Sequence, residues 1–428
     1  MTRPEPTPTP VDPRNEGTTC VIAGGGPAGI MLGLLLARSG IRVTVLEKHL
    51  DFLRDFRGDT VHPTTQGILD ELGLTAAFER IVRGRVDSVT MGTADSVILN
   101  ARIAGAAPWA RFRSIALAPQ WDFLDLLTEH ASHYPGFDLR LGAECTGVLR
   151  SARTGAVTGV RYRDEAGDHE LPAVLTVAAD GRRSTIRSAV DSPLIDLGAP
   201  MDVLWLRLPR RDSDGAGLRG VLGSGDLAVA IDRGDYWQLA YLIPKGSFAA
   251  VRARGIDVLR TRLVALLPFL VDRVAAVDWD DVKMLEVGLS RLQRWYSPGV
   301  LAIGDAAHTM SPIGGVGINL AVQDAVAAAR ILAPVLLRAQ DDPSRFRRTL
   351  NPRPLARVQR RRLPPAVLVQ RIQRTAQARV IDRVLTNGTV RLPFLLAADL
   401  RNNGLVARLI VRLLLYGIRP ERIPPAVP

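Results

Sequence analysis

The residues best suited to chemistry in this chain of 428 residues form three short glycine-containing motifs that are widely separated along the sequence. In the first, glycines permit a tight turn and let the backbone approach a pyrophosphate, while the helix that follows directs its unpaired N–H groups at the phosphates. An acidic residue then ends the next predicted strand, where a carboxylate accepts hydrogen bonds from ribose hydroxyls. The motif therefore predicts a site for the ADP half of a dinucleotide. Its candidate contacts are Gly24, Gly26, Pro27, Ala28, Gly29 and Glu47.

The second and third motifs each place an aspartate beside a glycine at the end of an apolar run. They are Asp180 with Gly181, and Gly304 with Asp305. Open α/β sheets place ligand contacts at the carboxyl ends of their strands. After the third motif a glycine-rich stretch leads into a long predicted helix, and such a helix start stabilises the negative charge of a reduced flavin. The candidate contacts in this stretch are Pro312, Gly314, Gly315, Gly317, Ile318 and Asn319.

A βαβ unit must position the first motif. The apolar run 18–23 predicts a strand, residues 30–38 a helix and residues 41–46 a second strand. Further helices are predicted over 65–72, 257–267, 317–337 and 405–416, and further strands over 112–117, 203–208 and 236–243. Prolines are predicted to interrupt the helical C-terminal tail at Pro352, Pro364, Pro365 and Pro393.

Composition limits the class of protein. Only two cysteines occur, Cys20 and Cys145, and two reduced thiols are typical of a reducing cytoplasm. No apolar run reaches the roughly 18–20 residues of a membrane span. Residues 1–16 are rich in proline and threonine and lack the apolar stretch of a signal peptide, so they are predicted to be a disordered lead. We therefore expect a cytoplasmic enzyme.

The excess positive charge belongs to the C-terminal tail. The formal net charge is +12, and residues 341–428 are rich in arginine and contain no lysine. Arg408 and Arg412 lie on one face of an apolar helix, which can pack on the protein itself, contact a second subunit in a homodimer, or lie on a membrane surface. Nucleic acid is not expected as a partner, because no aromatic residues alternate with the arginines.

In this order and at these intervals, the motifs resemble those of the class A flavoprotein monooxygenases, the p-hydroxybenzoate hydroxylase-like family, over residues 17–335. The resemblance implies an α/β fold with a Rossmann-like FAD-binding domain, an inserted β-sheet substrate domain and a C-terminal helical segment. The FAD-binding domain would comprise residues 17–85, 120–190 and 285–337, the substrate domain 86–119 and 191–284, and the Arg-rich helical segment 338–428.

The resemblance also implies roles for individual residues. Asp180 and Gly181 would serve both FAD and a visiting nicotinamide cofactor, and Asp305 would hold the ribityl chain of FAD. Arg57 and Gln120 match two further FAD-contacting positions of the family. Lys48 directly follows the ribose-binding carboxylate and joins the candidate cofactor contacts.

The implied activity is insertion of one oxygen atom from O₂ into an aromatic or polycyclic small molecule, by hydroxylation. In the family, NADPH or NADH reduces bound FAD, and reaction with O₂ gives a flavin C4a-hydroperoxide whose distal oxygen is transferred. The strands predicted over 112–117, 203–208 and 236–243 are expected to cover the substrate. No catalytic base can be identified from the sequence, and no metal is expected. The weak candidates are His62, Arg113, Arg207, Tyr236 and Tyr241, each of which also suits a structural role.

Three alternatives share the FAD motifs. A reductase or dehydrogenase would bind FAD and a nicotinamide without using oxygen. A flavin-dependent halogenase would add a WxWxIP motif and a reactive lysine, but residues 205–209 lack the second tryptophan and no lysine falls at the required place. A non-catalytic FAD-binding protein is the third alternative. Formation of an oxygenated product with O₂ uptake distinguishes the monooxygenase from all three.

Overall fold

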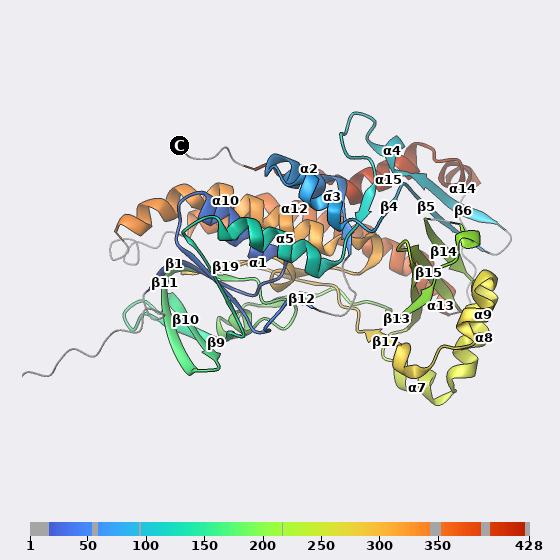
Figure 1. The fold of residues 1–428 in the computed structure, drawn as a ribbon, viewed down its shortest axis with the longest axis horizontal. Helices are drawn as coiled ribbons and strands as arrows, with labels where there is room; N and C mark the ends of the chain where they lie inside the picture. Colours follow the sequence, from blue (N-terminus) through green and yellow to red (C-terminus); the bar gives the residue numbers. More distant parts are fainter. Residues whose placement is uncertain are drawn as a thin grey trace, which may run out of the picture.

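The computed structural model describes residues 17–53, 59–93, 96–215, 217–342, 352–386 and 394–423. Figure 1 shows one sheet at each end of the molecule, with long helices running along the top of the view between them. This is the predicted α/β arrangement, with a second sheet and a C-terminal helical segment.

The first sheet has eight strands in the order β19-β20-β11-β1-β2-β8, and β10 pairs with both β11 and β9. Its centre is β1 (Thr18–Ala23), which runs parallel to β2 (Val43–Glu47) and to β11 (Gly167–Ala178). All of β1 after Thr18 is buried, as expected for a strand covered on both faces. The other strands are β8 (Phe137–Leu141), β9 (Glu144–Arg150), β10 (Val157–Asp164), β19 (Tyr296–Ser297) and β20 (Val300–Ala302).

Helix α1 (Pro27–Arg38) packs against α5 (Gln120–Ser132) and α10 (Gly317–Asp341). Residues 28–37 of α1 are all buried, because apolar and small side chains surround the helix on every side. The helical stretch that includes α10 is long and apolar enough to cross a membrane, but 67% of its apolar window is buried inside the protein. Such burial is typical of a core helix.

The second sheet has seven strands in the order β17-β13-β16-β15-β14-β5-β6. These are β5 (Ser88–Gly92), β6 (Val97–Arg102), β13 (Met201–Pro209), β14 (Leu218–Leu222), β15 (Leu227–Asp232), β16 (Tyr236–Pro244) and β17 (Lys283–Leu285). Helices α7 (Phe248–Ala253), α8 (Ile256–Leu266) and α9 (Val271–Val274) lie on the outer side of the sheet in Figure 1. Trp237 of β16 and Leu263 of α8 belong to the same buried apolar cluster there.

Two three-stranded sheets have the orders β3-β7-β4 and β12-β18-β21. Their strands are β3 (Thr60–Val61), β4 (Gly84–Val86), β7 (Ile115–Leu117), β12 (Leu194–Asp196), β18 (Ser290–Leu292) and β21 (His308–Thr309). The strand predicted over 112–117 is shorter than expected, because only residues 115–117 form a strand. Only β7 pairs, and it pairs with β3 and β4. The residues before it form a turn in which Arg113 Nε donates to the Ala110 carbonyl at 2.8 Å.

The described part of the C-terminal segment is mostly helical. It contains α12 (Arg353–Ala376), a π-helical turn (Gln377–Ile381), α13 (Asp382–Leu385), α14 (Phe394–Arg401) and α15 (Leu405–Leu415). The predicted interruption at Pro364 and Pro365 is wrong, because α12 runs through both prolines. A proline inside a helix costs about 3 kcal/mol. Packing of α12 on α10, with Val358 and Val369 in the main core, offsets that cost.

The other predicted interruptions fall outside helices or outside the described residues. Pro352 directly precedes α12, and Pro393 lies outside the described residues. The predicted helices 65–72, 257–267, 317–337 and 405–416 are confirmed as α2 (Pro63–Glu71), α8, α10 and α15. The shorter helices are α3 (Thr75–Ile81), α4 (Ile103–Ala106) and α6 (Thr185–Ala189).

Candidate functional site

The three motifs meet at one edge of the eight-stranded sheet. Ala23 at the end of β1 is in register with Ala178 of β11, which is in register with Ala302 of β20. Because these strands are parallel, the segments that follow them leave the sheet side by side. The three motifs, which are more than a hundred residues apart in sequence, therefore come together at the carboxyl ends of the strands, where open α/β sheets bind ligands.

The turn of the first motif requires glycine at two positions. Gly24 has a φ of 105°, and a Cβ there would lie 2.4 Å from the Ala179 carbonyl oxygen. A Cβ on Gly29 would lie 1.9 Å from the Gly24 carbonyl oxygen. Neither position can accept a side chain without movement of the backbone. The turn thus brings α1 against the start of the second motif.

The start of α1 is open toward a ligand. Pro27 occupies the first turn, no side chain caps the helix, and a Cβ on Gly26 would meet no atom within 4 Å. Glu47 is buried at the end of β2, where its Oε2 accepts from the Gly25 amide at 2.9 Å. Lys48 is exposed beside it. The start of α1 can therefore bind an anion. Glu47 lies close to it, because it accepts from Gly25, two residues before the helix.

The second and third motifs are joined by an ion pair. Asp180 Oδ2 accepts from the Ile186 amide at 3.2 Å, whereas its Oδ1 is buried and has no hydrogen-bond partner among the described residues. Gly181 has a φ of 80°. Arg182 Nε then donates to Asp305 Oδ2 of the third motif at 3.2 Å. Asp180 and Asp305 therefore present carboxylate oxygens on neighbouring turns.

The third motif is fixed from beneath by a buried carboxylate that sequence reasoning missed. Asp324 of α10 is fully buried, and its Oδ2 accepts from the Gly304 amide at 3.1 Å and lies 2.6 Å from His308 Nε2. Arg362 of α12 contacts Asp324 Oδ1 at 3.0 Å. Burial by itself would raise the pKa of Asp324, but the interactions with His308 and Arg362 outweigh it and lower the pKa. Asp324 therefore acts as an anion.

The loop after the third motif packs on β3. Gly314 and Gly315 have φ values of 78° and 60°, and a Cβ on Gly315 would lie 2.2 Å from Thr60 Oγ1. Asn319 Nδ2 donates to the carbonyl oxygens of Thr60 and Gly315, both at 3.0 Å. Pro312 precedes the turn, and Gly317 and Ile318 open α10. A Cβ on Gly317 would meet no atom within 4 Å, so this helix start also faces open space.

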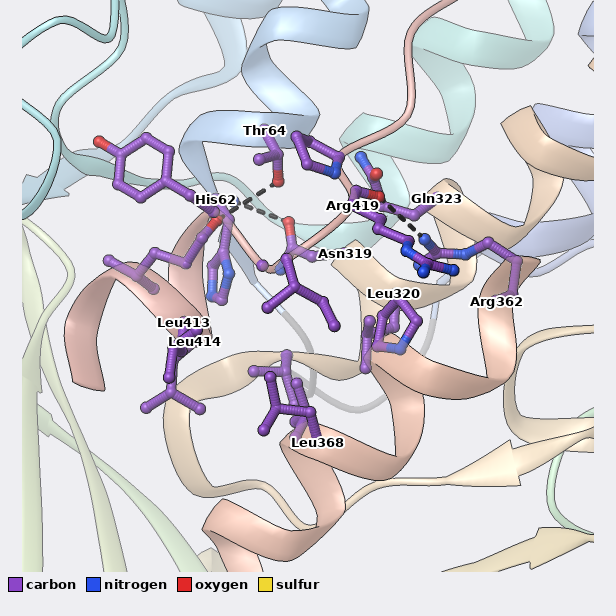
Figure 2. A pocket seen from close by; sticks show the side chains of 18 residues that line it. His62, Thr64, Asn319, Leu320, Gln323, Arg362, Leu368, Leu413, Leu414 and Arg419 are labelled. Carbon is purple, nitrogen blue, oxygen red and sulfur yellow. Dashed lines mark hydrogen bonds between the residues drawn. The ribbon is translucent and has the colours of Figure 1, made fainter. Parts of the chain in front are cut away.

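His62 supports the same loop from the other side. Its backbone amide donates to Asn319 Oδ1 at 2.8 Å, and its ring Nε2 lies 3.0 Å from the Gly314 carbonyl oxygen. Figure 2 shows the ring beside a cavity of about 30 Å³, with Leu413, Leu414 and Leu368 on its other walls. Burial lowers the pKa of His62 to about 4. The ring is therefore neutral near pH 7.

Two of the candidate residues lie together in the seven-stranded sheet. Arg207 of β13 lies over the ring of Tyr236 at the start of β16, 5.1 Å from its centroid. Asp59, just before β3, and Arg233, in the turn between β15 and β16, join them; sequence reasoning missed both. Burial raises the pKa of Asp59, and Arg233, the backbone amide of Gln120 and Arg207 oppose that shift. The only signal in the sequence that could have found Asp59 is its position two residues after Arg57, a candidate FAD contact. Arg57 itself lies outside the described residues.

The other two candidates lie elsewhere. Tyr241 donates to Asp226, which also accepts from Arg262 at 2.9 Å, and its ring belongs to the apolar cluster under α8. Burial and this carboxylate raise the pKa of Tyr241. Arg113 is exposed in the turn before β7. Neither residue contacts the three motifs through any described interaction.

A larger cavity opens beside the second and third motifs. It has a volume of about 610 Å³ and is lined by Arg182, Arg183, Glu286 and Thr309, among others. Arg182 Nη1 donates to the Glu286 carbonyl at 3.2 Å. The described residues contain no group of three or more His, Cys, Asp or Glu side chains that could hold a metal ion.

The donor set at this edge fits a dinucleotide. Two uncapped helix starts, at Pro27 and Gly317, offer N–H groups to anions. The space over Gly26 is open to a phosphate, and no described residue donates a hydrogen bond to the buried Asp180 Oδ1. FAD has both the phosphates and the hydroxyl donors that such residues bind.

Comparison with known proteins agrees with this geometry. Residues 17–345 match the family model of the FAD binding domain. The 6-methylpretetramide 4-monooxygenase of Streptomyces rimosus is 31% identical over 413 residues, which cover 95% of this chain and 94% of that protein. The structure of p-nitrophenol 4-monooxygenase PnpA from Pseudomonas putida matches with a TM-score of 0.76 at 21% identity, covering 95% of this chain and 99% of that one. The structure of OxyS anhydrotetracycline hydroxylase from Streptomyces rimosus has a TM-score of 0.73 at 22% identity, covering 96% and 78%.

These matches and the fold define a flavoprotein with the p-hydroxybenzoate hydroxylase fold. The chain belongs to the class A flavoprotein monooxygenases. It is an FAD-dependent monooxygenase, with NAD(P)H as the transient reductant typical of the family. The similarity favours oxygen insertion over the reductase, halogenase and non-catalytic alternatives.

Proposed function

We propose that this enzyme hydroxylates a polycyclic aromatic small molecule with FAD bound along the carboxyl edge of the eight-stranded sheet. The observation that carries the proposal is the meeting of the three motifs at that edge, with β1, β11 and β20 in one parallel register. Relatives named for 6-methylpretetramide, anhydrotetracycline and aklavinone support a polycyclic substrate.

The chain's own residues would hold the cofactor in three places. The start of α1 would bind the pyrophosphate and Glu47 the ribose, the Asp180 and Asp305 turns would bind the central chain, and the start of α10 would lie under the flavin ring. When bound, FAD supplies the activation of oxygen. The described residues in these roles are Gly24, Gly26, Pro27, Ala28, Gly29, Glu47, Lys48, Gln120, Asp180, Gly181, Gly304, Asp305, Pro312, Gly314, Gly315, Gly317, Ile318 and Asn319.

His62, which supports the loop beneath the proposed flavin ring, contributes no positive charge to it near pH 7. His62 is neutral near pH 7 because burial lowers its pKa to about 4. Stabilisation of negative charge on a reduced flavin therefore falls to the N–H groups at the start of α10. These donors are fixed in advance by Asn319 and Thr60, so they need no rearrangement when charge develops.

The test measures coupled oxygenation. The purified holoenzyme is incubated with NADPH or NADH and with polycyclic phenols that include anhydrotetracycline and aklavinone. We expect at least one compound to accelerate NAD(P)H oxidation, with equal O₂ uptake and a product heavier by one oxygen atom. Turnover of the same compound without O₂, or acceleration without any oxygenated product, would refute the proposal.

The proposal includes the division into domains, the oligomeric state and the location of the enzyme. We assign residues 86–119 and 191–284 to the substrate domain and residues 17–85, 120–190 and 285–337 to the FAD-binding domain. We also expect a cytoplasmic monomer or homodimer without bound nucleic acid. Because α15 packs on α4 and β6 through one face, only its other face is open to contact with a membrane surface or a second subunit.

A further inference from the structure

A buried ion pair joins the candidate flavin site to the seven-stranded sheet. Asp59 and Arg233 are each 5% exposed, and Arg233 Nη2 lies 3.3 Å from Asp59 Oδ2. Each partner leaves one buried atom without a hydrogen-bond partner among the described residues: Asp59 Oδ1 and Arg233 Nη1. The pair therefore contains one free acceptor and one free donor.

Two such atoms in one ion pair are unusual, because nearly all buried polar groups are hydrogen bonded. The rest of the pair is well satisfied, since Arg233 Nε donates to Gln238 Oε1 at 2.7 Å. Burial raises the pKa of Asp59 and lowers the pKa of Arg233. The surroundings thus penalise the charges of both groups, and a ligand that bonds to both free atoms would relieve that cost.

The position of the pair indicates what the ligand is. Asp59 directly precedes Thr60, whose Oγ1 donates to the Gly315 carbonyl at 3.0 Å in the loop under the proposed flavin ring. Arg233 lies in the β15–β16 turn, where a Cβ on Gly234 would lie 3.0 Å from the Arg83 carbonyl oxygen. The pair therefore lies where the seven-stranded sheet faces the flavin loop, which is where a substrate must bind to be oxygenated.

We infer that Asp59 and Arg233 bind the polar edge of the aromatic substrate, a hydroxyl group next to a carbonyl group. The hydroxyl donates to Asp59 Oδ1 and the carbonyl oxygen accepts from Arg233 Nη1. The inference rests on the proposed function and narrows its substrate to phenolic ketones. A carboxylate that accepts a hydrogen bond from the phenolic hydroxyl also increases the electron density of the substrate's aromatic ring. This favours attack of that ring on an electrophilic oxygen.

The bound flavin itself offers the same pair of hydrogen-bonding groups. The flavin ring carries an N–H group next to a carbonyl group on its pyrimidine edge, and that edge would also match the pair. A substrate-binding pair and a flavin-binding pair differ in which affinity they control. The experiment therefore measures both.

The probes are 1,8-dihydroxyanthraquinone, which has hydroxyl groups beside a carbonyl, and its 1,8-dimethoxy derivative, which keeps the carbonyl alone. Binding to the oxidised holoenzyme is followed by the change in flavin absorbance. We expect the wild-type enzyme to bind the dihydroxy compound at least about tenfold more tightly, as a hydrogen bond to a charged group requires. Asp59→Asn should reduce this preference to about twofold, with FAD affinity unchanged.

Two further variants keep the test independent of folding defects. Arg233→Lys should weaken binding of both compounds and leave their ratio intact, because both retain the carbonyl. Asp214→Asn changes an equally buried carboxylate that pairs with Arg273 in the same sheet domain, and it should leave both affinities unchanged. Far-UV circular dichroism confirms that each variant is folded.

Three results would overturn the inference. The first is a preference in Asp59→Asn equal to that of the wild type, with an unchanged FAD affinity. The second is an unchanged preference with an FAD affinity that falls about tenfold, which would assign the pair to the flavin. The third is that the wild-type enzyme binds neither probe or does not distinguish them. If no compound at all supports oxygenation, the proposed function fails separately.

Discussion

Arg362 of α12 donates from Nε to Oδ1 of Asp324 at 3.0 Å, and both side chains are almost fully buried. The other oxygen of the same carboxylate holds the Gly304 amide at 3.1 Å. Arg362 Nη1 also contacts Glu421 Oε1 at 3.5 Å, and Arg330 and Arg361 complete the shell around that glutamate. The Arg-rich tail is thereby connected to the third motif through Asp324, and Glu421 connects the end of the tail to α10 and α12.

Replacement of Arg362 by methionine should destabilise the protein. Removal of one partner of a buried pair leaves the other charge uncompensated, at a cost of about 3–5 kcal/mol. We expect a loss of this size in the free energy of unfolding in urea, together with reduced FAD content. Arg360→Gln, on the exposed side of the same helix, is the matched control and should change stability by less than about 0.5 kcal/mol. Equal stability of the two variants would show that the pair does not hold the tail.

His62 should make stability depend on pH in the acid range. Its folded-state pKa of about 4 lies below the ordinary value of 6.5, so between these values the unfolded chain binds more protons than the folded one. The contribution of the neutral His62 ring to the free energy of unfolding is therefore complete above about pH 6.5, and it falls by about 3 kcal/mol as the pH approaches 4. His62→Gln should show a flatter decline than the wild type when unfolding in urea is measured from pH 7.5 to 4.5. Parallel curves would contradict this prediction.

Tyr241 should prove structural. Its hydroxyl donates to Asp226, which retains a 2.9 Å bond from Arg262 when the tyrosine is replaced by phenylalanine. We expect Tyr241→Phe to cost about 1 kcal/mol of stability, the usual value of one hydrogen bond, because no charge is left unpaired. The kcat and KM of substrate-dependent NADPH oxidation should stay within about twofold of the wild type, or ~0.4 kcal/mol, because Tyr241 lies in the apolar cluster under α8 and not at the three motifs. A tenfold fall in kcat would restore Tyr241 as a catalytic candidate.

The sequence predicts the sheet edge well but the polar clusters poorly. The turns at Gly24, Asp180 and Gly304 are local, and each follows an apolar strand, so spacing and residue type suffice to locate them. Asp59 and Arg233, in contrast, are 174 positions apart in the chain and pair only because the β15–β16 turn packs against the segment before β4. The continuity of α12 through Pro364 and Pro365 likewise depends on packing against α10, which local propensity does not contain.

The glycines of the first motif should separate cofactor binding from folding. A Cβ on Gly26 meets no protein atom within 4 Å, so Gly26→Ala should fold with the stability of the wild type. In the proposed complex that methyl group would occupy the space of the pyrophosphate, and FAD affinity should fall by at least about tenfold, or ~1.4 kcal/mol.

For Gly29→Ala we expect the opposite result, a loss of stability in the absence of FAD. Its Cβ would lie 1.9 Å from the Gly24 carbonyl oxygen, so the turn between β1 and α1 must move before any ligand arrives. We expect a protein destabilised by about 1–3 kcal/mol even without FAD, because overpacking forces backbone shifts of that cost. Thermal unfolding of the two apoproteins and titration with FAD measure both effects. If Gly26→Ala bound FAD as tightly as the wild type, the pyrophosphate would not lie over this turn, and the proposed path of the cofactor along the sheet edge would be wrong.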